Sequence, residues 1–151
     1  MSNHDHDVKV LNTLIETTID SADGYDEAAK DSHNHRYTST FQTRAKERRE
    51  VSAALQRQVR ALGGKPEEDG SVLASAHRMF VNLRASISKG DRAVIEEVER
   101  GEDHIKHQFE DALQDDQLSA ATRLAISDAF SSVKAGHDQM RDLKQALQGQ
   151  S

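Results

Sequence analysis

The chain has 151 residues, of which 35% are hydrophobic, and its 20 Lys and Arg against 26 Asp and Glu give a formal charge of −6. These values predict a single acidic domain over 1–151 with a small core, and the absence of Cys excludes disulfides, thiol nucleophiles and Cys-based metal sites. An acidic balance with 2 Tyr, 4 Phe and no Trp disfavours nucleic-acid binding, and the lack of a long apolar run or a signal-peptide pattern predicts a cytoplasmic protein without membrane contact.

A first long helix is predicted over about 7–30, after a flexible tail over 1–6. Asp7 is a residue type that often caps a helix N-terminus. Apolar or small residues then recur at intervals of three and four, which is the helical period. They are Val8, Leu11, Ile15, Thr18, Ala22, Tyr25 and Ala29.

A second helix is predicted over about 34–62. Gly63, Gly64 and Pro66 follow its last apolar residue, and Gly after a helix with Pro shortly beyond is the usual C-terminal signal. A shorter helix is predicted over 71–88, and two more long helices over about 91–114 and 118–148.

The predicted architecture is all-α, a ferritin-like four-helix bundle with the shorter helix in the connection between the second and third long helices. Helices of about 24 to 30 residues are about 36 to 45 Å long, which suits such a bundle. The segment 71–88 is long enough to carry the chain back along the bundle, so the helices on either side of it run parallel. The alternative is a five-helix array in which 71–88 is an equal member.

The residues for a di-iron site are incomplete. Ferritin-like di-iron bundles use a Glu from each of two helices and a Glu-x-x-His from each of the other two. Here Glu47 and Glu50 have that spacing with Glu in place of His, and a cationic Lys134 precedes His137. We therefore expect neither a catalytic residue nor a cofactor. The alternative is an irregular iron or manganese site whose candidates are Glu47, Glu50, Glu102, Asp128 and His137.

Glu102 is the exceptional acid, because helical spacing places it in one apolar stripe with Ile105 and Phe109. A buried carboxylate must be paired, neutralised or bound to metal. Arg48 is the expected partner because it shares a seven-residue spacing with apolar positions of the second helix, and Arg78 is a second candidate. A structural ion pair, a single-metal site and acid–base catalysis all remain open. His137 also lies on an apolar stripe, as a core or boundary histidine.

Two surface features lead to further hypotheses. Glu16, Asp20, Asp23 and Glu27 form a predicted outward stripe that could face a basic partner. If Met1 is removed, the amine, amides and imidazole of Ser2-Asn3-His4 offer four nitrogens to Cu(II) or Ni(II), with His6 nearby.

Several motifs together resemble a bacterial family of ferritin-like four-helix-bundle proteins of unknown function, from about Val8 to Leu143. The resemblance implies a cytosolic bacterial protein that is stress-associated, and it singles out His77, Arg78, Arg100, Glu102 and Asp103. The motifs are Leu11-Asn12-Thr13-Leu14-Ile15-Glu16-Thr17, Asp20, Gly24-Tyr25, Ala28-Ala29, Leu62-Gly63-Gly64, Pro66, Gly70-Ser71, His77-Arg78 and Glu99-Arg100-Gly101-Glu102-Asp103.

The preferred hypothesis is a non-catalytic, stress-associated accessory or interaction protein with a polar network around Glu102. The members of that network are Arg48, His77, Arg78, Arg100, Glu102 and Asp103. A divergent iron- or manganese-binding protein and an acidic partner-binding module are the alternatives. The expected partner of the protein is a second copy of the chain or an unidentified protein.

Overall fold

The computed structural model describes residues 3–31, 35–70 and 89–149. These residues form four α-helices: α1 (Asn3–Asp31), α2 (His35–Ala61), α5 (Asp91–Leu113) and α6 (Ala120–Gly149). The described ranges contain no strand, so the all-α four-helix bundle is confirmed. The predicted ranges 34–62, 91–114 and 118–148 differ from the bounds of α2, α5 and α6 by at most two residues.

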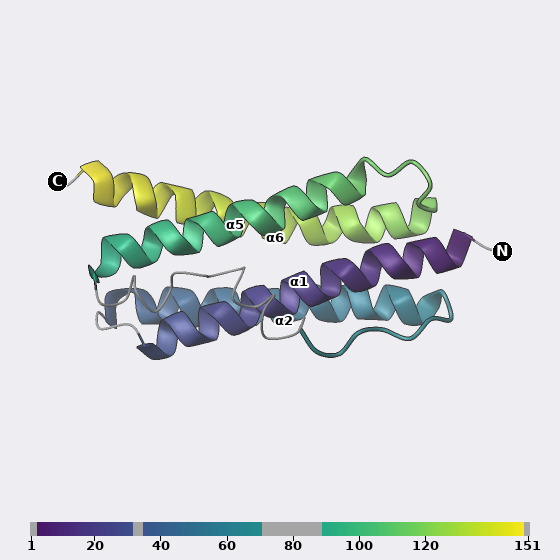
Figure 1. The fold of residues 1–151 in the computed structure, drawn as a ribbon, viewed down its shortest axis with the longest axis horizontal. Helices are drawn as coiled ribbons and strands as arrows, with labels where there is room; N and C mark the ends of the chain where they lie inside the picture. The colour runs from purple at the N-terminus through teal and green to yellow at the C-terminus, as the bar shows by residue number, and fades with distance from the viewer. Residues whose placement is uncertain (1–2, 32–34, 71–88, 150–151) are drawn as a thin grey trace.

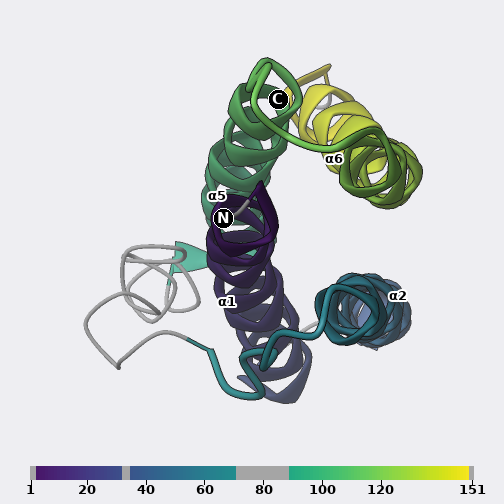
Figure 2. The ribbon, with the colours of Figure 1, turned by 90° about the vertical axis from the view of Figure 1, so that its right-hand side faces the viewer.

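The four helices form two antiparallel hairpins, α1 with α2 and α5 with α6 (Figure 1). Seen along the bundle, α1 packs on α2 and α5, and α6 packs on α5 and α2 (Figure 2). The helices α2 and α5 are therefore diagonal to each other, and they run in the same direction, as the crossover prediction required. The predicted helix over 71–88, with His77 and Arg78, lies outside the described residues.

The core consists of the apolar stripes that the spacing predicted. Each helix contributes side chains with almost no exposure, such as Leu11, Phe41, Phe109 and Met140. The rings of Phe109 and Phe130 stack across α5 and α6 with centroids 6.2 Å apart. Within the described ranges, no helix is both long enough and apolar enough to cross a membrane.

The glycines after α2 make the turn that the sequence indicated. Gly63 has φ 80°, and its N–H donates to the carbonyl of Arg60, while the N–H of Gly64 donates to the carbonyl of Val59. This pair of bonds is the Schellman motif, which needs a residue that tolerates left-handed backbone. A Cβ on Gly64 would lie 2.7 Å from Val8, so the same turn also packs against α1.

The loop after α2 corrects one prediction about the surface of α1. Asn12 fastens this loop by donating to the carbonyl of Lys65 and accepting from the N–H of Glu67. The chain then passes so close to α1 that a Cβ on Gly70 would overlap Asp20. Asp20 is consequently buried, not outward-facing as its helical position predicted.

The N-terminus corrects a second prediction. Residues 3–6, expected to be a flexible tail, belong to α1, and Asp7 is buried within the helix instead of capping it. His6 Nε2 lies 2.7 Å from Asp115 Oδ2, and the Asp7 carboxylate accepts from the N–H and the hydroxyl of Ser119. Ser119 in turn accepts from the N–H of Thr122 at the start of α6. These tertiary partners hold the first turn of α1 in place.

Asp7 makes the stability of the fold depend on pH. Burial raises the pKa of Asp7, but hydrogen bonds from Ser119 and Thr122 lower it, and the net pKa lies below its ordinary value of 3.8. A carboxylate with a lowered pKa stabilises the fold above its unfolded pKa, and this contribution is lost as pH falls through the folded pKa. We expect Asp7→Asn to reduce the free energy of unfolding at pH 7 by about 1–2 kcal/mol.

Urea denaturation at pH 7 and at pH 3 measures this effect. The difference between wild type and Asp7→Asn should shrink at the lower pH. Asp5→Asn, at an exposed position of the same helix, is the matched control and should change stability by less than about 0.5 kcal/mol. An Asp7→Asn effect that is equal at both pH values would contradict the assignment.

Candidate functional site

A buried ion pair between α2 and α5 lies at the centre of the bundle. Arg48 Nη2 donates to Glu102 Oε2 over 2.7 Å, and neither side chain has any exposed surface. The hydroxyl of Tyr25 on α1 donates to the other carboxylate oxygen, Glu102 Oε1, at 2.5 Å. Arg48 Nη1 donates to Ser21 Oγ at 2.9 Å, and Nη2 lies 3.4 Å from the carbonyl oxygen of Val133 on α6. We call Ser21, Tyr25, Arg48 and Glu102 the core network.

The electrostatics of the core network fix the protonation of Arg48 and of Tyr25. Burial lowers the pKa of Arg48, but the neighbouring Glu102 carboxylate and Tyr25 raise it by more, and the net pKa is raised. Burial and then the charge of Glu102 raise the pKa of Tyr25 well above its ordinary value of 10.0. Tyr25 therefore keeps its proton and remains a donor, while Arg48 keeps its charge. The guanidinium carbon of Arg48 also lies 5.8 Å from the centroid of the Tyr25 ring, within cation–π range.

Gly136 on α6 makes the space for this guanidinium. A Cβ at Gly136 would lie 2.5 Å from Arg48 Nη2 and 3.0 Å from Cδ of Arg44, a second buried arginine of α2. Arg44 crosses to α6 beside it and donates to Gln139 there and to Glu47 on its own helix. At this level of the bundle, two arginine side chains of α2 therefore pass a residue of α6 that has no side chain.

Two other predicted members of the network lie elsewhere. Arg100 is exposed and donates to Glu97 on its own helix, 2.6 Å away, not to Glu102. Asp103 contacts His137 instead. Adjacent residues on a helix point about 100° apart, so the neighbours of an inward Glu102 face other directions.

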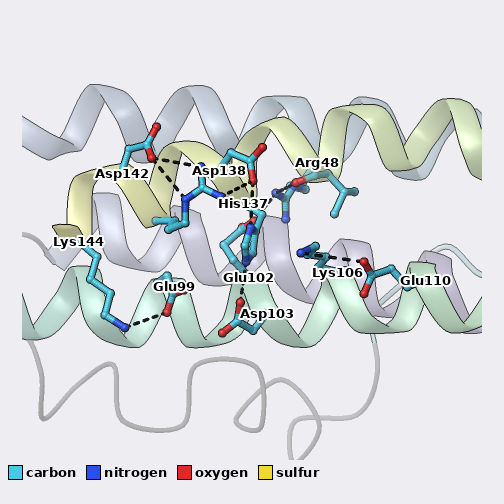
Figure 3. A network of polar contacts seen from close by, with 12 residues as sticks. Arg48, Glu99, Glu102, Asp103, Lys106, Glu110, His137, Asp138, Asp142 and Lys144 are labelled. Carbon is cyan, nitrogen blue, oxygen red and sulfur yellow. Dashed lines mark hydrogen bonds and ion pairs between the residues drawn. The ribbon is translucent and has the colours of Figure 1, made fainter. Parts of the chain in front are cut away.

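Asp103 belongs to a second polar group, the α5–α6 cluster, which comprises Glu99 and Asp103 of α5 and His137 of α6 (Figure 3). His137 Nε2 lies 2.6 Å from Asp103 Oδ1, and Nδ1 lies 3.3 Å from Oδ1 of Asp138. Glu99, Asp103 and His137 each offer one ligand atom within 4.8 Å of the others. Lys144 Nζ lies 3.3 Å from Glu99 Oε2. The hydrogen bond with His137 lowers the pKa of Asp138.

The other predicted metal ligands are not brought together. Glu47 pairs with Arg44, and Glu50 and Asp128 are exposed. His4 is exposed in the first turn of α1, and the Ser2 amine that its copper or nickel site needs lies outside the described residues. Among the described residues, the one group with metal-ligand spacing is the α5–α6 cluster.

Sequence reasoning missed several contributors, and three of them had a signal in the sequence. Tyr25 was assigned only to the apolar stripe, although a buried Tyr hydroxyl usually needs a partner. Gly136 is a mid-helix Gly, which signals close approach of another element. Glu99 lies four residues before Asp103 and so shares its helix face, a spacing that could have indicated the cluster.

The family model described as a domain of unknown function, DUF2383, matches residues 6–115, a range that contains the whole core network and ends before α6. A search of curated proteins finds no match.

The ion pair predicts a specific pattern of mutant stabilities. Arg48→Met leaves a buried carboxylate without its cation and should cost about 3–5 kcal/mol of unfolding free energy, and Glu102→Gln leaves a buried guanidinium with a similar effect. The double variant contains neither buried charge, so it should lose less than the sum of the two single losses.

Urea denaturation of the wild type, the two single variants and the double variant measures this coupling. The neighbouring Arg49 is the matched control, because its pairs with Asp23 and Asp26 are exposed. Arg49→Met should cost less than about 1 kcal/mol. Strict additivity of the Arg48 and Glu102 variants would refute an interdependent pair.

Gly136→Ala should have the opposite sign to the usual helical substitution. Ala in a helix interior is normally more stable than Gly by about 0.5–1 kcal/mol. Here the added methyl group collides with Arg48, which is fully buried and held by Glu102, so we expect a loss of about 1–3 kcal/mol. Ala135→Gly, at the exposed neighbouring position, reports the ordinary difference in the same helix. Thermal or urea unfolding that shows Gly136→Ala to be stabilising would contradict the assigned close contact.

Proposed function

Because the chain belongs to the DUF2383 family, whose description states no activity, we propose from its geometry that it is a non-catalytic helical bundle that serves as an accessory or interaction protein. In this proposal the core network is a structural device that sets the register of the helices. The protein acts through its outer surface on a second copy or on another protein.

The occupancy of Glu102 carries this proposal. Both of its oxygens are engaged, one by Arg48 and one by Tyr25, and the side chain has no exposed surface. A catalytic acid or base must reach the proton that it transfers, and a metal ligand needs room for the ion beside its oxygen atoms. Glu102 is closed off from solvent, and the Arg48 guanidinium lies beside it, so its environment supports a structural role.

A di-iron function is less well supported. The residues predicted as its ligands are not brought together: Glu47 pairs with Arg44, and Glu50 faces solvent. The cationic Arg48 fills the place beside Glu102 where an iron would have to bind. A positive guanidinium repels a divalent cation strongly in a low-dielectric interior.

The acidic-module alternative also loses support. Asp20 is buried, and Arg49 donates to both Asp23 and Asp26, so the acidic surface of α1 is partly neutralised by its own neighbour α2. A surface with internal counter-ions attracts a basic partner less strongly than four unpaired acids would.

The motif resemblance supports a more specific form of the proposal. It favours a ferritin-like, bacterial, cytoplasmic protein with a stress-associated role and without a resident cofactor in its core. The parallel arrangement of α2 and α5 is compatible with the single long crossover of ferritin-like bundles.

Iron content tests this proposal directly. Protein purified from cells grown in iron-rich medium should lack a stoichiometric di-iron centre when measured by elemental analysis. Glu102→Gln, which cannot supply a charged ligand, is the companion variant. Two irons per chain in the wild type that are lost in Glu102→Gln would overturn the structural role of Glu102 and with it the proposed function.

A further inference from the structure

We propose that the α5–α6 cluster is a binding site for a single divalent transition-metal ion, with Glu99, Asp103 and His137 as ligands. Their ligand atoms lie within 4.8 Å of one another, close to the separation that three ligands of one ion require. Metal–nitrogen and metal–oxygen bonds of about 2.0–2.2 Å place ligand atoms about 3 to 4.4 Å apart. The cluster lies at the seam between α5 and α6 and uses none of the core network (Figure 3).

The orientation of His137 is the strongest support for a cation at this position. Its Nδ1 faces Asp138 Oδ1 at 3.3 Å and its Nε2 faces Asp103 Oδ1 at 2.6 Å. In the tautomer in which Nδ1–H donates to Asp138, the Nε2 lone pair and the Asp103 carboxylate point at each other, as two ligands of one ion point at a shared centre. A proton spans their present separation of 2.6 Å, and a metal ion requires the half-exposed Asp103 side chain to move until the two atoms lie at least about 3 Å apart. A ligating histidine typically donates its other N–H to a carboxylate, and Asp138 takes that role in this tautomer.

The accessibility of the three side chains suits an ion that enters from solvent. His137 is 7% exposed and Glu99 13%, so both are held by packing, while Asp103 is 47% exposed. Glu99 and Asp103 are four residues apart on one helix, a spacing at which like charges repel. A shared cation would remove that repulsion.

Lys144 supplies the cation for Glu99 in the absence of metal. Its Nζ lies 3.3 Å from Glu99 Oε2 with 32% of the side chain exposed. A flexible, partly exposed lysine can move into solvent when a metal ion takes its place, because such pairs contribute little stability. Lys144 is therefore a competitor of the metal, not part of its site.

The donor set defines the class of metal. One imidazole and two carboxylates suit Zn²⁺, Mn²⁺ and Fe²⁺, with water in the remaining positions. The set differs from Glu47, Glu50 and Glu102, so a single ion in this cluster is independent of a di-iron centre in the core.

Titration with Zn²⁺ and Mn²⁺ by isothermal calorimetry tests the site. The full chain should carry His4→Gln, so that the terminal nitrogens cannot contribute. We expect one ion per chain, and at least a tenfold loss of affinity in Asp103→Asn and in His137→Gln. His107→Gln, at an exposed position of α5, is the matched control and should leave affinity unchanged. Stoichiometric binding that survives both ligand variants, or no binding at millimolar ion, would overturn the proposal.

Two further measurements separate a ligand role from a purely structural one. Lys144→Gln should tighten binding by a factor of about two to five, because it removes the competitor for Glu99. In the folded protein without ligand substitutions, Mn²⁺ should broaden amide resonances around Glu99, Asp103 and His137. Broadening centred elsewhere, or a Lys144→Gln variant that binds more weakly, would contradict the assigned ligands.

Discussion

The full burial of the Arg48 charge is the constraint on which the rest of the bundle depends. A guanidinium in the interior must find its counter-ion and its acceptors there. Glu102 of α5 supplies the counter-ion, and Ser21 of α1 supplies an acceptor. Tyr25 donates to the other carboxylate oxygen of Glu102, and Gly136 of α6 has no side chain that would collide with the guanidinium. Apolar side chains alone tolerate sliding, but a shift of α5 by one turn, about 5.4 Å, would separate the two buried charges. The ion pair therefore selects one register among several that the apolar stripes allow.

Two consecutive residues of α5, Glu102 and Asp103, belong to two separate polar groups. Glu102 points into the bundle, has no exposed surface and has both oxygens engaged. Asp103 points along the seam with α6, is half-exposed and meets an imidazole. The first environment is closed and neutral overall, so it serves stability. The second is open to solvent and rich in acceptors, so a lysine and a metal ion can replace each other there. The angular step of the helix is sufficient to separate these two environments.

Periodicity predicted most of the fold because each helix buries a stripe that is visible in its own sequence. It also predicted Arg48 beside Glu102, since both charges interrupt apolar stripes. It did not predict that Tyr25 completes the pair, because the donor comes from a third helix. Asp20 was wrongly assigned to the outer surface. The loop after α2 buries it, and a loop has no helical periodicity from which its position could be predicted. The ligand group around His137 was missed since it depends on how α5 and α6 are rotated against each other.

The contacts of the first turn of α1 have a consequence for the order in which the chain can acquire its structure during translation. Asp7 binds Ser119, which is synthesised more than a hundred residues later. Arg48 likewise pairs with Glu102 of the second hairpin, so a nascent hairpin of α1 and α2 lacks the counter-ion of its central cation. Burial of that cation without its counter-ion would be costly. Closure of both the middle and the end of the bundle is therefore deferred until the second hairpin emerges, and the four helices are completed as one cooperative unit.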